Sequence, residues 1–143
     1  METKVFDLGM IDDEKLKFAV IVSKYNGKFV YVRHKKRDTW EVPGGHRELN
    51  EAINDTAARE LKEETGAVKF NIKPVCDYLC EYSLARENID KSYGRVYYAE
   101  IEELGQLPNL EIGEIALFDK MPENLTYPQI QPILLHWVLK KQI

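Results

Sequence analysis

The sequence is poor in cysteine, with only Cys76 and Cys80 among its 143 residues. Two thiols are too few for a disulfide framework, and a C-x₃-C pair with no histidine nearby is a poor zinc site. Their even spacing would place both on one face of a strand, where buried, reduced thiols are the expected form. We therefore expect a reducing compartment, the cytoplasm.

Long apolar runs and an excess of basic residues are also missing. No segment approaches the roughly 20 apolar residues of a membrane-spanning helix, and residues 1–4 do not begin a signal peptide. The net charge of −4 argues against general nucleic-acid binding, because the phosphate backbone favours a basic protein face. The length and the ordinary composition predict one globular domain over residues 1–143.

The hydrophobic pattern predicts strands before and after a central helix. Asn26-Gly27 is a strong hairpin turn signal between two apolar runs. A closing helix is expected where an apolar stripe repeats at helical spacing. This order of elements predicts a mixed sheet with helices packed on it. The expected strands are 18–22, 29–32, 40–42, 95–101 and 115–118, with a β-rich segment at 68–84 and the closing helix at 128–141.

Four carboxylates, those of Glu51, Glu60, Glu63 and Glu64, are crowded into the glycine-bounded stretch 45–67. Like charges this close repel one another, and a bound cation relieves the repulsion. On a helix, Glu60, Glu63 and Glu64 would share one face. Oxygen-only ligands favour Mg²⁺, with Mn²⁺ as a substitute, over zinc. For these three glutamates alone, a solvated acidic helix face is the alternative.

A helix is expected over residues 51–65. Asn50 suits the N-cap, although asparagine also tolerates a left-handed backbone, and Gly66 stands where a C′ glycine ends a helix. Three apolar residues share a separate face and would dock this helix onto a core: Ile53, Ala57 and Leu61.

The acidic segment resembles the signature of the Nudix hydrolases. That signature is glycine, five residues, glutamate, seven residues, Arg-Glu, an apolar residue, any residue, Glu-Glu, any residue, glycine and an apolar residue. The signature has seven fixed residues. If each residue type has a usage of roughly 7%, a chain of this length would match all seven by chance about once in a million. Ala67 is smaller than the usual aliphatic residue. The matching positions are Gly45, Glu51, Arg59, Glu60, Leu61, Glu63, Glu64, Gly66 and Ala67.

The resemblance implies the fold, an α/β/α sandwich with a mixed sheet, and a role for each signature residue. Glu60, Glu63 and Glu64 would bind divalent cations, and Gly44 and Gly45 would bring the backbone close to the metal, with the Gly44 carbonyl as a ligand. The first glutamate, Glu51, would pair with Arg59 and brace the loop against the helix. Because Arg59 points about 100° away from Glu60 on a helix, we expect it not to neutralise the metal ligands directly.

The implied chemistry is metal-assisted attack of water on a diphosphate. Nudix families differ in which carboxylate accepts the proton of the water. Glu64 is one candidate, and Glu111 and Glu114, just before the strand expected at 115–118, are others. The last two are equally well read as ordinary surface charges.

The one basic cluster, residues 33–37, precedes the signature. Arg33 resembles the position from which mutator-type Nudix enzymes contact nucleotide phosphate, and Lys35 and Arg37 are weaker candidates. His34 could be only surface, and a solvated loop is the alternative for the whole run. Tyr82 is a candidate for stacking on a base, as are Tyr93, Tyr97 and Tyr98, although strand tyrosines are more often core.

The leading hypothesis is a Mg²⁺-dependent enzyme of the mutator type, with a small-molecule nucleotide as its substrate. It would hydrolyse a nucleoside triphosphate, oxidised or not, to the monophosphate and pyrophosphate. The alternatives are a hydrolase of nucleotide sugars or ADP-ribose-like diphosphates and, less favoured because every signature carboxylate is present, a Nudix-fold sensor that binds without turnover. The sequence leaves the oligomeric state open, either a monomer or a homodimer.

Overall fold

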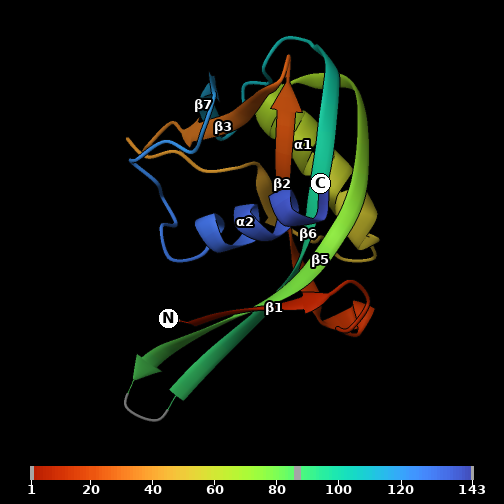
Figure 1. The fold of residues 1–143 in the computed structure, drawn as a ribbon, viewed down its shortest axis with the longest axis vertical. Coiled ribbons are helices and arrows are strands. Elements are labelled where there is room, and N and C mark those ends of the chain that lie inside the picture. The colour runs from red at the N-terminus through yellow and green to blue at the C-terminus, as the bar shows by residue number, and fades with distance from the viewer. Residues whose placement is uncertain (1, 86–87, 143) are drawn as a thin grey trace.

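The computed structural model describes residues 2–85 and 88–142, without the side chains of residues 82–89 and 142. The chain forms a sheet and two helices, with a short 3₁₀ turn, η1, before the second strand (Figure 1). In chain order the elements are β1 (Glu2–Asp7), η1 (Asp13–Lys15), β2 (Leu16–Tyr25), β3 (Lys28–His34), β4 (Gly44–His46), α1 (Ile53–Thr65), β5 (Ala67–Ala85), β6 (Asn88–Leu104), β7 (Ile112–Phe118) and α2 (Gln131–Gln142).

The sheet is mixed, as the order of elements predicts. Its strand order is β1-β5-β6-β2-β3-β7, and β4 pairs separately with β2. β2 and β6 run parallel, whereas the other pairs are antiparallel. β5 and β6 form a long hairpin, and the end of β5 and the start of β6 extend away from the body of the protein (Figure 1).

Two apolar cores lie on opposite faces of this sheet. The side chains of successive strand residues alternate between the faces, so Ile21 on β2 enters one core and Val22 enters the other. In Figure 1, α2 lies in front of the strands and α1 behind them. The face of α1 that carries Ile53, Ala57 and Leu61 is buried as expected, and the α/β/α sandwich is confirmed.

The ends of α1 differ partly from expectation. The N-cap is Ala52 and not Asn50, because Asn50 takes a left-handed backbone with φ of 62° and lies in the preceding turn. At the other end, Gly66 has φ of 77° and donates its N–H to the carbonyl of Lys62, as a C′ glycine should.

The strand expected at 40–42 does not form. Glu41 makes only an isolated bridge to Val32, and Trp40 makes another to Leu125, so the segment crosses between neighbours without joining the sheet. The β-structure instead resumes at β4, where Gly44 and Gly45 pair with Val20 and Ala19.

One edge of β2 is divided between two partners, and this division opens a cleft. β3 pairs with β2 only beside the Asn26-Gly27 turn, at Lys24 and Tyr25, whereas β4 pairs near the start of β2. Because β3 then diverges from β2, space is left between β3, β4 and the polar face of α1.

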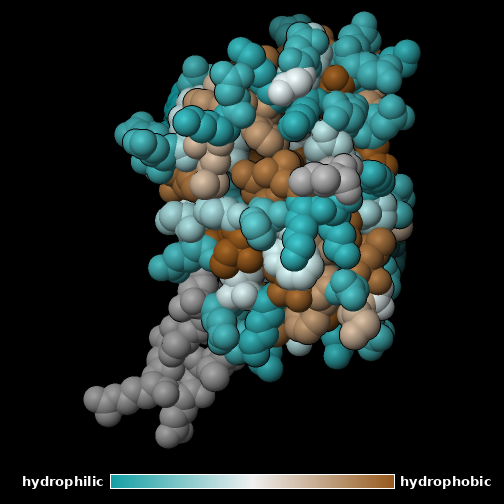
Figure 2. Space-filling view, viewed as in Figure 1, coloured by the Kyte–Doolittle hydropathy of each residue, from teal (hydrophilic) through white to brown (hydrophobic). Residues whose placement is uncertain are grey.

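One face of the molecule is largely polar (Figure 2). The face seen in Figure 2 is covered mainly by hydrophilic side chains, with apolar residues showing in patches among them. Within the described part of the chain, neither helix has the length and apolar character needed to cross a membrane.

Candidate active site

The diverging strands enclose a cleft of about 830 Å³ with two chemically different halves. One half is acidic and is formed by α1, β4, the end of β3 and the loop before β7. The other half is largely apolar and is formed by β2, β5, the segment before β4 and the segment that leads into α2. The acidic half includes Gly44, Gly45, Glu60, Glu63, Glu64, Glu41 and Glu111, and the apolar half includes Phe18, Val20, Val42, Tyr78, Cys80, Tyr127 and Ile130.

The two glycines before the helix allow the carboxylates of α1 to approach the backbone. The N–H of Gly44 donates to Oε1 of Glu64 at 2.8 Å. A Cβ on Gly45 would lie 2.4 Å from the carboxyl carbon of Glu60, so any side chain at this position would displace that carboxylate. Gly44 and Gly45 are therefore brought together with Glu60 and Glu64, as the sequence predicts.

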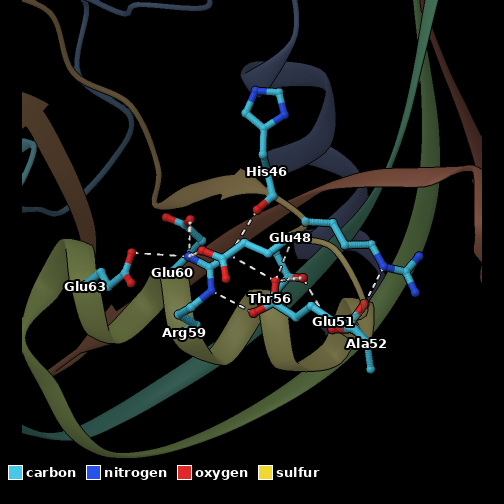
Figure 3. A network of polar contacts seen from close by, with 9 residues as sticks. His46, Glu48, Glu51, Ala52, Thr56, Arg59, Glu60 and Glu63 are labelled. Carbon is cyan, nitrogen blue, oxygen red and sulfur yellow. Dashed lines mark hydrogen bonds and ion pairs between the residues drawn. The ribbon is translucent and has the colours of Figure 1, made fainter.

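Arg59 organises the acidic face of α1 (Figure 3). Its Nε donates to Glu51 Oε2 at 2.7 Å, which is the brace that the resemblance implies. Its Nη1 also reaches Glu60 Oε1 at 2.9 Å and Glu63 Oε2 at 3.3 Å. The expectation that Arg59 does not neutralise these glutamates is wrong, because its long side chain folds back across them.

Glu51 is held from several sides and lies away from the cleft. Besides Arg59, it accepts hydrogen bonds from the Thr56 hydroxyl at 2.6 Å and from the Glu48 N–H at 3.1 Å. The hydrogen bond from Arg59 is the main reason that the pKa of Glu51 falls to about 2. This carboxylate is therefore ionised under all ordinary conditions and anchors the arginine.

The pKa values of the carboxylates inside the cleft, Glu60 and Glu64, are shifted in the opposite direction from that of Glu51. Burial raises the pKa of Glu64 to about 8, and the nearby carboxylates Glu60, Glu41 and Glu111 add to the effect. Burial also raises the pKa of Glu60. Glu63 is more open, with 39% of its side chain exposed. A buried group of oxygen donors that resists ionisation in the absence of a cation suits a hard divalent metal.

The basic cluster divides between the cleft and its surroundings. Arg37 lines the cleft and pairs with Glu41 at 3.2 Å. Arg33 does not line the cleft. It donates to Glu114 at 3.1 Å and to the carbonyl of Arg37 at 2.9 Å. Lys35 contacts Asn109 at 2.6 Å and likewise lies outside the cleft lining.

The two loop glutamates are separated by the fold. Glu111 lines the cleft, whereas Glu114 pairs with Arg33 beside it. The side chain of Tyr82 lies outside the described residues, so its predicted stacking role stays a prediction. Tyr97 and Tyr98 are buried in the two cores and do not line the cleft.

Several residues that line the cleft are not apparent from the sequence. Tyr78 and Tyr127 supply its aromatic surface, and the buried Gln131 accepts the N–H of Val42 at 2.9 Å. His34, for which a surface position was one alternative, lines the cleft from the end of β3. The position of His34 at a strand end, shortly before the signature glycines, is the one signal that could have indicated it.

Curated relatives share the central part of this chain. Bacillus subtilis YtkD, provisionally named an 8-oxo-dGTP diphosphatase, is 35% identical over 108 residues, which are 74% of this chain and 64% of that protein. A MutT-like protein of Streptomyces ambofaciens is 42% identical over 48 residues, 34% of this chain and 31% of the relative. The chain thus spans less than two thirds of the length of these relatives.

Solved structures match nearly the whole fold. The Bacillus subtilis pyrophosphohydrolase BsRppH superposes with a TM-score of 0.75 at 26% identity, covering 96% of this chain and 90% of its own. The NUDIX domain of Shewanella oneidensis NrtR, solved with ADP ribose, gives 0.66 at 17% identity over 95% and 96% of the two chains, a likeness of fold alone. The family model described as the NUDIX domain matches residues 14–119, and the chain belongs to this family.

Proposed function

We propose that the protein is a divalent-metal-dependent pyrophosphohydrolase that converts a nucleoside triphosphate to the monophosphate and pyrophosphate. The observation that carries this proposal is the convergence of Glu60, Glu63 and Glu64 at one end of the cleft, against the closely packed backbone of Gly44 and Gly45. The family and its pyrophosphohydrolase members support the class of reaction.

The donor set fits Mg²⁺, with Mn²⁺ as a substitute. Glu60, Glu63 and Glu64 offer carboxylate oxygens, and Gly44 lies beside them with its carbonyl available as a further ligand of the same kind. A divalent cation held there would neutralise phosphate charge and lower the pKa of a bound water. We propose that Glu51 and Arg59 keep the α1 carboxylates in position, and that a carboxylate of the cluster, Glu64 or Glu111, accepts the proton of the water.

The two halves of the cleft fit the two parts of a nucleotide. The acidic half would hold the diphosphate through its cation, with Arg37 as a direct cationic contact. The apolar half offers Tyr78, Tyr127 and Phe18, side chains on which a base and sugar can pack. The similarity to YtkD makes a triphosphate with an oxidised guanine the first nucleotide to test, in keeping with a housecleaning role.

The test is a substrate panel in which pyrophosphate and phosphate are measured separately. Nucleoside triphosphates, including 8-oxo-dGTP, are compared with ADP-ribose, dinucleoside polyphosphates and nucleotide sugars, each with Mg²⁺ or EDTA. Metal-dependent release of pyrophosphate from a triphosphate is the expected result. Monophosphate without pyrophosphate would move the protein to the hydrolases of other diphosphates, and binding without any turnover would make it a sensor.

A matched pair of variants ties turnover to the site. Glu63→Gln should lower kcat by about 10³-fold, since it removes a cation ligand from the transition state. Glu103→Gln, an exposed glutamate on β6 outside the cleft, should leave kcat unchanged. Equal rates for both variants would refute the assignment of the site.

The remaining properties are proposed from the sequence. We propose a cytoplasmic protein, because Cys76 and Cys80 are both free and buried. We also propose that residues 1–143 act as one domain on small-molecule nucleotides, without general nucleic-acid binding or membrane association. Whether the chain is a monomer or a homodimer is answered by light scattering coupled to size-exclusion chromatography.

A further inference from the structure

A second group of metal-ligand atoms lies in the cleft, beside the Glu60 and Glu63 carboxylates. It is formed by His34 at the end of β3, Glu64 on α1 and Glu111 in the loop before β7. One ligand atom from each lies within 4.8 Å of the other two. All three side chains line the cleft. Three elements far apart in the sequence thus converge on one point with one imidazole nitrogen and two carboxylates.

An irregularity in the sheet brings His34 and Glu111 together. β3 and β7 pair regularly as far as Arg33 and Glu114, but His34 then pairs with Ile112, so Gly113 is an extra residue on β7. Such a bulge changes the direction of the side chains beyond it. The N–H of Lys35 donates to the carbonyl of Glu111 at 3.0 Å and holds the loop against the end of β3.

Nothing in the described residues neutralises the two carboxylates of this group. Glu64 is only 5% exposed, and its one hydrogen bond in the described part of the chain is from the Gly44 N–H to Oε1. Among the described side chains, no lysine or arginine forms an ion pair with Glu64 or Glu111. The neighbouring arginines are engaged elsewhere, Arg33 with Glu114 and Arg37 with Glu41.

A further carboxylate lies near the imidazole, outside the group. Nε2 of His34 lies 4.0 Å from Oε2 of Glu41, a carboxylate that is 10% exposed and itself paired with Arg37. Carboxylates beside a ligating histidine commonly orient its ring. With 24% of its side chain exposed, His34 lies partly buried in the wall of the cleft.

We propose that His34, Glu64 and Glu111 form a cation position that prefers Mn²⁺ or Co²⁺ to Mg²⁺, adjacent to the position at Glu60 and Glu63 and sharing Glu64 with it. The preference follows from the ligands, because an imidazole nitrogen suits transition metals, whereas Mg²⁺ is bound almost entirely by oxygen. The inference deepens the proposed metal-dependent function, but it concerns binding and requires no turnover.

The direct test is pulsed electron paramagnetic resonance of Mn²⁺ bound to the tag-free protein, since electron spin-echo modulation detects a directly coordinated histidine ¹⁴N. We expect ¹⁴N modulation in the wild type and its loss in His34→Gln. The matched control is His136→Gln, an exposed histidine on α2 outside the cleft, which should retain the signal. Absence of ¹⁴N modulation in the wild type, or its persistence in His34→Gln, would overturn the proposal.

Calorimetric titration of the metal-free protein provides a second readout. His34→Gln should weaken Mn²⁺ and Co²⁺ binding at this position by about tenfold or more, and change Mg²⁺ binding by less than about threefold. Glu111 is exposed in a loop, so Glu111→Gln is the second variant if His34→Gln does not fold. It should weaken Mn²⁺ and Co²⁺ binding in the same way. An equal change for Mg²⁺ and Mn²⁺ would refute the selectivity.

The two proposals fail separately. If the wild type shows histidine modulation but hydrolyses no substrate of the panel, the cation position stands and the enzymatic function does not. If it releases pyrophosphate with Mg²⁺ but shows no ¹⁴N coupling to Mn²⁺, the function stands and the position at His34 does not.

Discussion

Replacing Glu64 by glutamine should stabilise the metal-free protein while abolishing its proposed activity. Glu64 is 5% exposed, and burial among other carboxylates raises its pKa from 4.5 to about 8. An acid whose pKa is higher in the folded state binds its proton more tightly there. Its contribution to stability is therefore lost as the pH rises from about 4.5 to about 8, and glutamine, which has no charge to bury, avoids this loss.

The size of the effect follows from the shift. Each pKa unit corresponds to about 1.4 kcal/mol, so a shift from 4.5 to about 8 sets an upper bound near 5 kcal/mol at pH 8 or above. Glutamine keeps an oxygen for the Gly44 N–H, and the preference of that hydrogen bond for the charged carboxylate is already contained in the shifted pKa. Below this upper bound we expect a gain of about 2–4 kcal/mol, or roughly 7–13 °C in Tm for a domain of this size.

The assay is thermal and urea unfolding in EDTA at pH 5 and pH 8, followed by unfolding with Mg²⁺ and by kinetics. Glu64→Gln should unfold later than the wild type at pH 8, with a much smaller difference at pH 5. Mg²⁺ should stabilise the wild type more than the variant, because the variant has lost a ligand. The kcat should fall by about 10³-fold or more.

The control is the neighbouring residue on the same helix. Glu63 has 39% of its side chain exposed, so Glu63→Gln should cost activity without stabilising the metal-free protein. If Glu64→Gln is no more stable than the wild type at pH 8, or if its gain is the same at both pH values, the argument from charge burial is wrong.

Three further perturbations test the architecture of the site. Gly45→Ala places a Cβ about 2.4 Å from the carboxyl carbon of Glu60, so kcat should fall by about 10²-fold with an unchanged circular dichroism spectrum; an unaltered kcat would refute the close packing. Glu51→Gln should destabilise by about 1–3 kcal/mol at pH 7 in urea unfolding. Because the folded pKa of Glu51 is about 2, this difference should shrink as the pH falls from about 4.5 towards 2, and a constant difference would contradict its ionic role. Arg37→Ala should raise KM several-fold at similar kcat, unlike Lys36→Ala outside the cleft lining, and equal KM values would exclude phosphate contact.

The helix α1 and the layers around it could be predicted because they depend on local signals. The apolar spacing of Ile53, Ala57 and Leu61, the glycine at 66 and the Asn-Gly turn each act within a few residues, and each has the expected outcome. β1 was not expected, since its pairing with β5 joins residues about 75 positions apart and its sequence alternates only weakly.

The positions of the signature residues in the cleft could be predicted from the sequence, whereas those of the cleft residues outside the signature could not. Gly45 and Glu60 lie in one loop and the helix that follows it. The close approach of the Glu60 carboxylate to the Gly45 backbone therefore follows from local geometry. The position of His34 depends instead on the bulge at Gly113, nearly 80 residues away, which no local pattern reveals. Glu41 is buried for a similar reason, because its segment crosses to β3 without joining the sheet.

The wrong prediction for Arg59, that it does not neutralise Glu60 and Glu63, shows how these like-charged carboxylates are held close together. Helical geometry fixes the direction of the Cα–Cβ bond, but an arginine carries its charge several bonds further, and here Nη1 lies between Glu60 and Glu63. A cation bound by those two carboxylates must therefore compete with Arg59. The competition is limited because Arg59 also binds Glu51 and the carbonyl of His46, so the guanidinium can give up Glu60 and Glu63 and still remain paired. We therefore propose that Glu51 contributes to metal affinity indirectly, as the anchor that keeps Arg59 in place when a cation binds Glu60 and Glu63.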